Sequence, residues 1–179
     1  MATKDIVLIA LFAALVAALG VVPNITLPMA GGVPITAQSM GVMLAGALPG
    51  AKRGGLAIVL FLVLVAVGLP LLSGGRGGAG VFFGASGGFL FGFPVGAFVI
   101  GYLFDRHIGQ PSFLQGLIYV LIGGIGVVYV FGVPWLASVA EITLWQALVG
   151  SVAFLPGDLI KAVLTVLIAR EVRKAMPNL

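Results

Sequence analysis

The sequence predicts an all-α integral membrane protein that forms one domain of six transmembrane helices over residues 1–179. Of the 179 residues, 61% are hydrophobic and only 8% are charged, whereas a soluble domain has about 25% charged residues. The mean hydropathy is +1.26, and the apolar residues fall in long runs separated by short segments rich in glycine, proline and charge. No stretch has the polarity of a separate soluble domain.

The predicted spans follow from the length of these runs, because a helix needs about 20 apolar residues to cross the hydrocarbon core. The first run, 6–22, ends before Pro23, which cannot continue a helix. The second, 37–48, follows the loop "PNITLPMAGGVPIT" and is short unless that loop dips into the membrane. The turns "PGAKRGG" and "DRHIGQPS" and the two longer connections 73–88 and 132–145 delimit the other four spans, at 56–72, 89–104, 113–131 and 146–169.

The charges predict the orientation of these spans. One side carries nearly all the basic residues: Lys4, Lys52, Arg53, Arg106, Arg170, Arg173 and Lys174. The other side has only Arg76. Since cytoplasmic loops carry the excess of lysine and arginine, both termini are expected in the cytoplasm, in agreement with an even number of spans. Placement at the ends of apolar runs also argues against nucleic-acid binding as the reason for the net charge of +4.

Two connections on the outer side, 23–36 and 73–88, are long for such a small protein. Irregular backbone is not tolerated where it faces lipid in the hydrocarbon region. These connections therefore lie outside the membrane or line a cavity enclosed by protein, and both are candidate lids.

Two charged residues lie inside the last span, in "FLPGDLIKAVL". Asp158 and Lys161 are three residues apart and share a helix face. Arg170, nine residues further on, is about 13 Å away along the axis, so Lys161 is too deep to reach the cytoplasm by extending its side chain. A charge near the bilayer centre costs about 2.5–3.5 kcal/mol. Pro156 and Gly157 weaken the helix just before the pair, and such breaks are typical of binding sites in membrane helices.

Three interpretations of this pair are open. It is a self-neutralising ion pair between helices, or a proton or ion relay, or the polar anchor of a ligand cavity. In the last case Lys161 would hold an anion and Asp158 would accept N–H donors. The relay is the weakest interpretation, because the only other carboxylate near the membrane interior is Glu141, close to the outer end.

The first span carries small residues four apart, at Ala10, Ala14 and Ala18. Such a face allows another helix to approach closely, either within this protein or in another membrane subunit. Trp135 and Trp145 flank the last outer loop, where they suit either the membrane interface or a cavity wall.

The sequence has no nucleophile with a nearby base, no phosphate-binding loop and no cysteine, so neither an enzyme nor a metal or cofactor site is expected.

Three stretches together resemble the biotin-specific substrate-binding subunits (S components, BioY type) of energy-coupling-factor transporters. They are "GGVPITAQSMGVMLAGALPGAKRG", "GGAGVFFGASGGFLFGFPVGAFVIGYLFD" and "FLPGDLIKAVL". The likeness extends over essentially the whole chain. One departure is that Ala85 and Ser86 replace a Pro-Thr pair before Gly87 and Gly88, and another is that Phe89 replaces a tyrosine.

The resemblance implies a six-helix fold with a ligand cavity near the outer surface, high-affinity capture of biotin, and the cytoplasmic membrane of a prokaryote as the location. It implies ligand-binding roles for Asp158, Lys161, Ser86, Gly87, Gly88, Gln38, Phe89, Trp135 and Arg76. Phe82, Phe83, Phe89 and Trp135 are expected to form the apolar wall. Ala10, Ala14 and Ala18 match the face that meets the transmembrane coupling subunit, and two separate ATPase subunits would hydrolyse ATP.

Biotin suits these residues, because a lysine can bind its carboxylate and an aspartate can accept the N–H groups of its ureido ring. The sequence does not assign the two ends of biotin to residues. It also leaves open an S component for another vitamin, and an autonomous ion-coupled carrier of small molecules.

Overall fold

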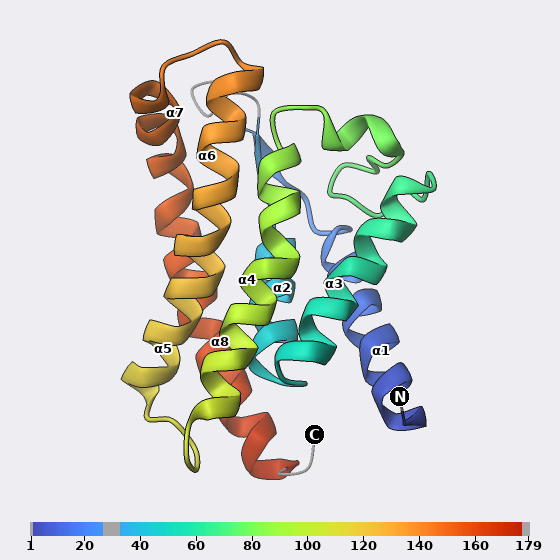
Figure 1. Ribbon diagram of the computed structural model, residues 1–179, viewed down its shortest axis with the longest axis vertical. Coiled ribbons are helices and arrows are strands. Elements are labelled where there is room, and N and C mark those ends of the chain that lie inside the picture. The colour runs from blue at the N-terminus through green and yellow to red at the C-terminus, as the bar shows by residue number, and fades with distance from the viewer. Residues whose placement is uncertain (1, 27–32, 177–179) are drawn as a thin grey trace.

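The computed structural model describes residues 2–26 and 33–176 and is built almost entirely of helices (Figure 1). The α-helices are α1 (Thr3–Leu19), α2 (Gln38–Ala47), α3 (Ala51–Ala66), α4 (Gly87–Arg106), α5 (Phe113–Leu121), α6 (Val128–Val139), α7 (Leu144–Ser151) and α8 (Leu155–Ala175). A π-helical segment, η3 (Ile122–Val127), joins α5 to α6, and a 3₁₀ turn, η4 (Val152–Phe154), joins α7 to α8. A second 3₁₀ turn, η2 (Ala79–Phe82), lies in the connection before α4, and strands β1 (Ile25–Thr26) and β2 (Pro34–Ile35) form a short antiparallel pair.

These elements make six helical segments within the described ranges, as predicted: α1, α2, α3, α4, α5–η3–α6 and α7–η4–α8. Three of them are long and apolar enough on their own to cross a membrane, namely Gly87–Arg106, Phe113–Val139 and Leu144–Ala175. The last two are longer than the predicted spans 113–131 and 146–169, because α6 continues through Pro134 to Val139 and α8 continues to Ala175.

Helix α2 has only ten residues and lies at the centre of the molecule, packed against α1, α3, α4 and α8. Every residue from position 41 to 51 is buried. Small residues allow this burial: a side chain at Gly46 would come within 2.6 Å of the Ala97 carbonyl oxygen of α4. The surrounding helices thus shield α2 from lipid, which explains why this segment needs less than the length of a full span.

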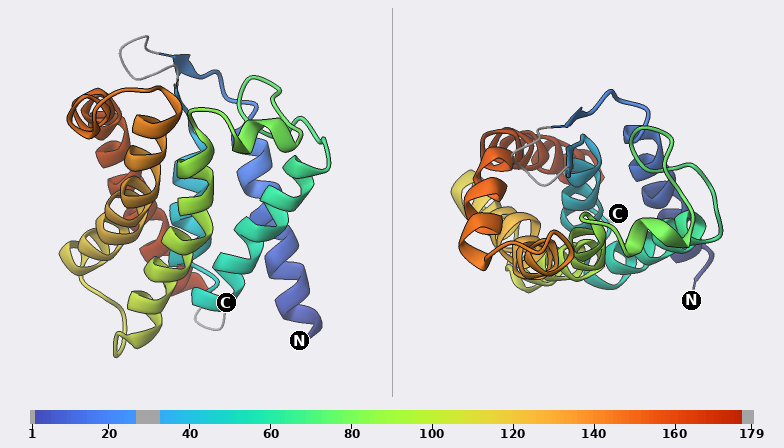
Figure 2. Two further views of the ribbon diagram at one scale, coloured as in Figure 1. Left: turned by 45° about the horizontal axis from the view of Figure 1, so that its top comes forward. Right: turned by 90° about the horizontal axis from the view of Figure 1, so that it is seen from above.

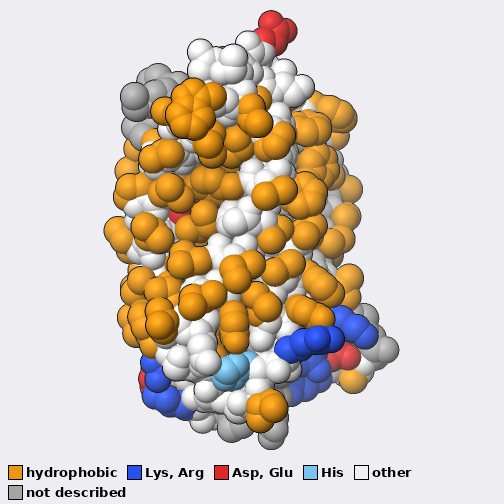
Figure 3. Space-filling model, turned by 60° about the vertical axis from the view of Figure 1, so that its left-hand side comes forward, with side chains coloured by type: hydrophobic (Ala, Val, Ile, Leu, Met, Phe, Trp, Pro, Cys, Tyr) orange, Lys and Arg blue, Asp and Glu red, His pale blue; other side chains and the backbone are white. Residues whose placement is uncertain are grey.

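The exterior is apolar along its sides and basic at one end. Figure 3 shows a broad band of hydrophobic side chains with lysine and arginine gathered at the lower end of the same face. Helix α1 begins and α8 ends at this end, so the two ends of the described chain lie on the same side (Figures 1 and 2). The basic residues that the sequence assigns to one side of the membrane therefore lie together at one end of the molecule.

A stripe of glycines packs α4 against α6 and the π segment. Gly88, Gly92 and Gly96 follow one another four residues apart, the spacing that allows close helix contact in membranes. A side chain at Gly92 would meet the Cα of Val128 at 3.0 Å, and one at Gly88 would collide with the side chain of Trp135 and lie 2.5 Å from the Phe131 carbonyl oxygen.

We expect Gly88→Ala to destabilise the protein, because its methyl group has no room between α4 and α6. Overpacking of this kind costs about 1–3 kcal/mol, and thermal unfolding of the purified protein in detergent should show it as a lowered melting temperature. Gly80→Ala is the matched control, since nothing lies within 4 Å of the added carbon there. Equal melting temperatures for the two variants would contradict the packing role of Gly88.

Candidate functional site

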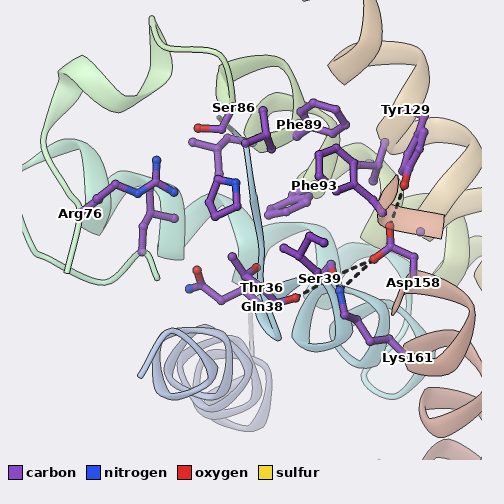
Figure 4. Close-up of a pocket in the computed structure, with 18 residues that line it drawn as sticks. Thr36, Gln38, Ser39, Arg76, Ser86, Phe89, Phe93, Tyr129, Asp158 and Lys161 are labelled. Atoms are coloured by element: carbon purple, nitrogen blue, oxygen red, sulfur yellow. Dashed lines mark hydrogen bonds and ion pairs between the residues drawn. The ribbon is translucent and has the colours of Figure 1, made fainter. Parts of the chain in front are cut away.

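A cavity lies between β2, α2, α4, α6 and α8, beneath the connections that join α1 to α2 and α3 to α4 (Figure 4). Its polar lining residues are Thr36, Gln38, Ser39, Arg76, Ser86, Tyr129, Asp158 and Lys161. Its apolar lining comes mainly from Val33, Ile35, Leu72, Phe89, Leu90, Phe93, Val128 and Phe154. An apolar cavity with a few converging polar groups is the usual form of a small-molecule site.

The break between α7 and α8 places the charged pair at the cavity. Pro156 lacks an N–H group, and the Val152 carbonyl accepts the N–H of Leu155 within the 3₁₀ turn. A new helix begins there, with Asp158 in its first turn. The positive end of the helix dipole favours a carboxylate at this position. The predicted local weakness is thus a helix start that presents Asp158 to the cavity.

Asp158 and Lys161 are bonded to each other and to two further side chains. Lys161 Nζ donates to Asp158 Oδ1 at 2.9 Å and to Ser39 Oγ at 3.0 Å. Ser39 Oγ lies 3.3 Å from Asp158 Oδ1, and the Tyr129 hydroxyl donates to Asp158 Oδ2 at 2.9 Å. The Asp158 side chain is only 10% exposed and that of Lys161 only 15%. The ion pair of the first interpretation is therefore formed, and it is also part of the cavity wall.

The sequence did not single out Ser39 and Tyr129, which complete this cluster. A signal for each exists: Tyr129 carries a hydroxyl inside an otherwise apolar run, and Ser39 belongs to the polar stretch "TAQS" that opens the second span. Tyr129 follows closely on the π segment, where α-helical hydrogen bonding is interrupted by "IGGIGV". Such π segments are often found at functional sites, and Gly124 within it also lines the cavity.

Gln38 lines the cavity, and its amide group is used in holding neighbouring segments together. Its Nε2 donates to the Val16 carbonyl at 3.1 Å and to the Leu71 carbonyl at 3.0 Å, and its Oε1 accepts the Ser73 N–H at 2.9 Å. The side chain is thereby bonded to α1 and to the connection that follows α3. This arrangement fixes the position of the cavity wall from which Arg76 projects.

Arg76 lies on the opposite side of the cavity from Asp158 and Lys161 (Figure 4). Its Nε donates to the Ser73 carbonyl at 3.2 Å. Burial lowers the pKa of its guanidinium from the ordinary value, but arginine stays protonated in proteins. The cavity therefore has a cation at one side and an acid–base pair at the other, with phenylalanine rings between them.

Six of the predicted ligand-binding residues line this cavity: Asp158, Lys161, Ser86, Gln38, Phe89 and Arg76. Gly87, Gly88 and Trp135 lie outside its lining. Trp135 Nε1 donates to the Gly84 carbonyl at 3.0 Å, and both glycines make room for close contacts with the Trp135 side chain. These three residues therefore fix the start of α4 against α6.

The apolar wall differs from the expected one. Phe82 and Phe83 lie outside the lining, and the Phe83 side chain is 75% exposed. Phe93 and Phe154 take their place beside Phe89. The Phe89 ring lies edge to face with the rings of Tyr129 and Phe154, with centroids 5.9 and 6.0 Å apart.

Both candidate lids contribute to the cavity. The connection 73–88 supplies Arg76 and Ser86, and the connection 23–36 supplies Pro34 and Thr36. Residues 27–32 of the latter lie outside the described part of the chain. The segment before α2 thus lines the cavity, as expected if the loop preceding this short helix dips inward.

Ala10, Ala14 and Ala18 form an exposed face of α1, which we call the alanine face. The opposite side of α1 is buried through Phe12 and Val16. The alanine face is therefore turned away from the packing between α1 and the rest of the described chain.

We expect Lys161→Met to destabilise the protein, because it leaves the Asp158 carboxylate buried without its cation. Loss of one partner of a buried pair costs about 3–5 kcal/mol. The double variant Asp158→Asn/Lys161→Met removes both charges and should recover part of the lost melting temperature. Lys174→Met is the control, since its i,i+3 partner Glu171 on the same helix is solvent-exposed. A double variant no more stable than Lys161→Met would contradict this account of the pair.

The comparison with known proteins agrees with the architecture and with the resemblance. The BioY family matches residues 1–178 of the chain. Biotin transporter BioY of Rhizobium etli is 51% identical, with 100% of this chain and 98% of that protein covered, and biotin transporter BioY of Rhodobacter capsulatus is 46% identical, with 98% and 96% covered. These relatives are transporters, in agreement with the prediction that the chain is not an enzyme.

A solved structure has the same fold. The crystal structure of the S-component for biotin from an ECF-type ABC transporter superimposes with a TM-score of 0.89 at 37% identity, covering 97% of this chain and 95% of that one. The predicted membrane fold of six helices is thereby confirmed. Since the family match extends over the whole length but one residue, and the fold agrees with it, this chain belongs to the BioY family.

Proposed function

We propose that this chain is the biotin-binding S component of an energy-coupling-factor transporter. It captures biotin with high affinity and mediates its uptake across the cytoplasmic membrane of a prokaryote. A transmembrane coupling subunit and two ATPase subunits supply the energy. Membership of the BioY family and the fold shared with a biotin S component support this proposal.

The observation that carries the proposal is a cavity with a cation on one side, an acid–base pair on the other and aromatic rings between them. Biotin has a carboxylate at one end, a ureido ring with two N–H donors at the other, and an apolar chain between. The Asp158 carboxylate accepts N–H donors, and the Tyr129 hydroxyl beside it can bind the same ring. The Lys161 ammonium is already balanced by Asp158, so Arg76 is the cation that suits the biotin carboxylate. We therefore assign the ureido ring to the Asp158 side and the carboxylate to the Arg76 side.

The orientation follows from the basic end of the molecule. Seven lysine and arginine residues lie on the side predicted to be cytoplasmic: Lys4, Lys52, Arg53, Arg106, Arg170, Arg173 and Lys174. The positive-inside rule supports a cytoplasmic location for this end and for both termini. Asp158, in the first turn of α8, is about 22 Å along the helix from Arg173 in the last turn. The cavity therefore opens toward the outer side.

The alanine face of α1 is proposed to bind the transmembrane coupling subunit. Three exposed alanines four residues apart leave a smooth surface on which the helix of another subunit can pack closely. Their exposure supports contact with another protein over packing within this chain.

We expect Asp158→Asn and Arg76→Ala each to weaken biotin binding about tenfold to hundredfold, because each removes a hydrogen bond to a charged group. Lys161→Ala should also weaken it, since Asp158 then loses the partner that keeps it ionised and positioned. Isothermal titration of the purified protein with biotin measures these changes. Lys174→Ala is the control on the same helix and should bind as the unchanged protein does.

The same titration tests the alternatives. Tight binding of another vitamin in place of biotin would identify an S component with a different ligand. Uptake of biotin into liposomes without any ATPase, abolished when the ion gradient is collapsed, would identify an autonomous carrier. Unchanged biotin affinity in both Asp158→Asn and Arg76→Ala would overturn the assignment of the site.

We expect Ala14→Leu to reduce association with the coupling subunit while biotin binding stays unchanged, because the larger side chain separates the two helices. Co-purification of tagged subunits measures association. Ser138→Leu is the control, since it places the same leucine at a small, exposed position on another helix, α6. Parallel loss of association and of biotin binding in Ala14→Leu would instead indicate that the face serves packing within this chain.

A further inference from the structure

A groove runs along the outside of the molecule between α3 and α4, and its lining shares no residue with the cavity or with the alanine face. Its walls are Leu56, Val59, Val95 and Phe98, and its floor is Gly55 and Pro94. We call it the α3–α4 groove. The four wall side chains are 39–44% exposed. The groove therefore lies open on the part of the surface that faces the membrane.

The floor of the groove results from the close approach of the two helices. A Cβ atom at Gly55 would lie 3.4 Å from Phe98 Cβ and 3.6 Å from the Pro94 carbonyl oxygen. Because glycine has no side chain to fill the space, α3 and α4 leave a depression between their outward-facing residues. In a bilayer such a depression must be filled, since unfilled apolar surface loses its packing contacts.

One end of the α3–α4 groove carries a lysine. Lys52 borders both the groove and a second depression at the basic end, which Arg53 and Arg173 also line. The two acids in that depression are already bonded: Asp5 accepts from Arg53 Nε at 2.7 Å, and Asp105 accepts the Ala51 N–H at 2.8 Å.

Among the side chains of residues 2–26 and 33–176, none forms a hydrogen bond or ion pair with Lys52, which is exposed. It also lies in the first turn of α3, where the helix dipole disfavours a cation. Lys52 thus has no stabilising role in its own helix, and its ammonium group is available to an external anion.

We propose that the α3–α4 groove binds one acyl chain of a phospholipid with an anionic headgroup, whose phosphate group pairs with Lys52. The shape and the charge both fit this ligand. From Lys52 to Val59 the groove is about 10 Å long, within the roughly 15 Å thickness of one hydrocarbon leaflet. Basic pockets between transmembrane helices on the cytoplasmic side bind anionic headgroups in this manner.

The test is native mass spectrometry of the purified full chain in detergent, with phosphatidylglycerol and phosphatidylcholine of identical acyl chains. The unchanged protein should retain one phosphatidylglycerol with about fivefold preference over phosphatidylcholine, the effect of one lysine near the membrane surface. Lys52→Ala should bind the two lipids alike. Val95→Phe, which fills the groove, should retain neither.

Two matched variants serve as controls. Lys174→Ala removes a lysine at the same end of the molecule, and Val130→Phe enlarges a valine on α6 that is 70% exposed. Both should keep the fivefold preference, and circular dichroism should show that all four variants have the helix content of the unchanged protein.

The proposal is overturned if Lys52→Ala keeps the preference for phosphatidylglycerol, or if Val95→Phe retains lipid as before. In the second case, size-exclusion chromatography with light scattering shows what the groove does instead. A changed oligomeric state of Val95→Phe would identify the groove as a contact with another protein chain.

Discussion

The buried bond between Lys161 and Asp158 is the constraint on which the arrangement of the cavity depends. A charge in the membrane interior is costly, and each of these two makes the other tolerable. The pair also needs Ser39 of α2 and Tyr129 of α6, since the carboxylate has further lone pairs and the ammonium further protons to satisfy. Three helices that are distant in sequence are thereby held in register at one point. A ligand that binds here must make bonds at least as good as those it replaces.

The central helix α2 connects this point with the basic end of the molecule. Its first residues, Gln38 and Ser39, bond to the cavity wall and to Lys161. Its last residue, Ala47, accepts Arg173 Nε at 2.8 Å through its carbonyl, and the Arg173 guanidinium lies over the Phe104 ring. Helices α2 and α8 are therefore bonded to each other at both ends. A displacement of α2 at the cavity is opposed by the bonds at the other end, so the cavity and the basic end are mechanically connected.

Sequence reasoning predicted those features that depend on spacing along one element. The depth of Asp158 and Lys161 follows from their distance to Arg170, and the inward position of the segment before α2 follows from the shortness of the span 37–48. Features that depend on distant segments were not predictable in this way. Ser39 and Asp158 are separated by 119 residues, and no pattern in either segment indicates that they meet.

Residue types that commonly serve either of two roles also limit what can be predicted from the sequence. Gly87, Gly88 and Trp135 suit a binding site as well as helix packing. Resemblance to a family indicates which positions correspond, but it does not show in which direction each side chain points. The structure separates the two roles through neighbouring atoms: Trp135 is bonded to the Gly84 carbonyl, while Ser86, next to Gly87, lines the cavity. A change of one position along a helix turns a side chain by about 100°, so adjacent residues face different surroundings.

The same reasoning applies to the basic residues, which the positive-inside rule counts as equivalent. Their partners distinguish them. Arg173 is held by a backbone carbonyl and an aromatic ring, and Arg53 by Asp5. Lys52, in the described part of the chain, has no such bond and stands at the end of an apolar groove. Charge along the sequence therefore predicts the orientation of the protein, whereas the bonds already made by each charge decide which of them can bind something else.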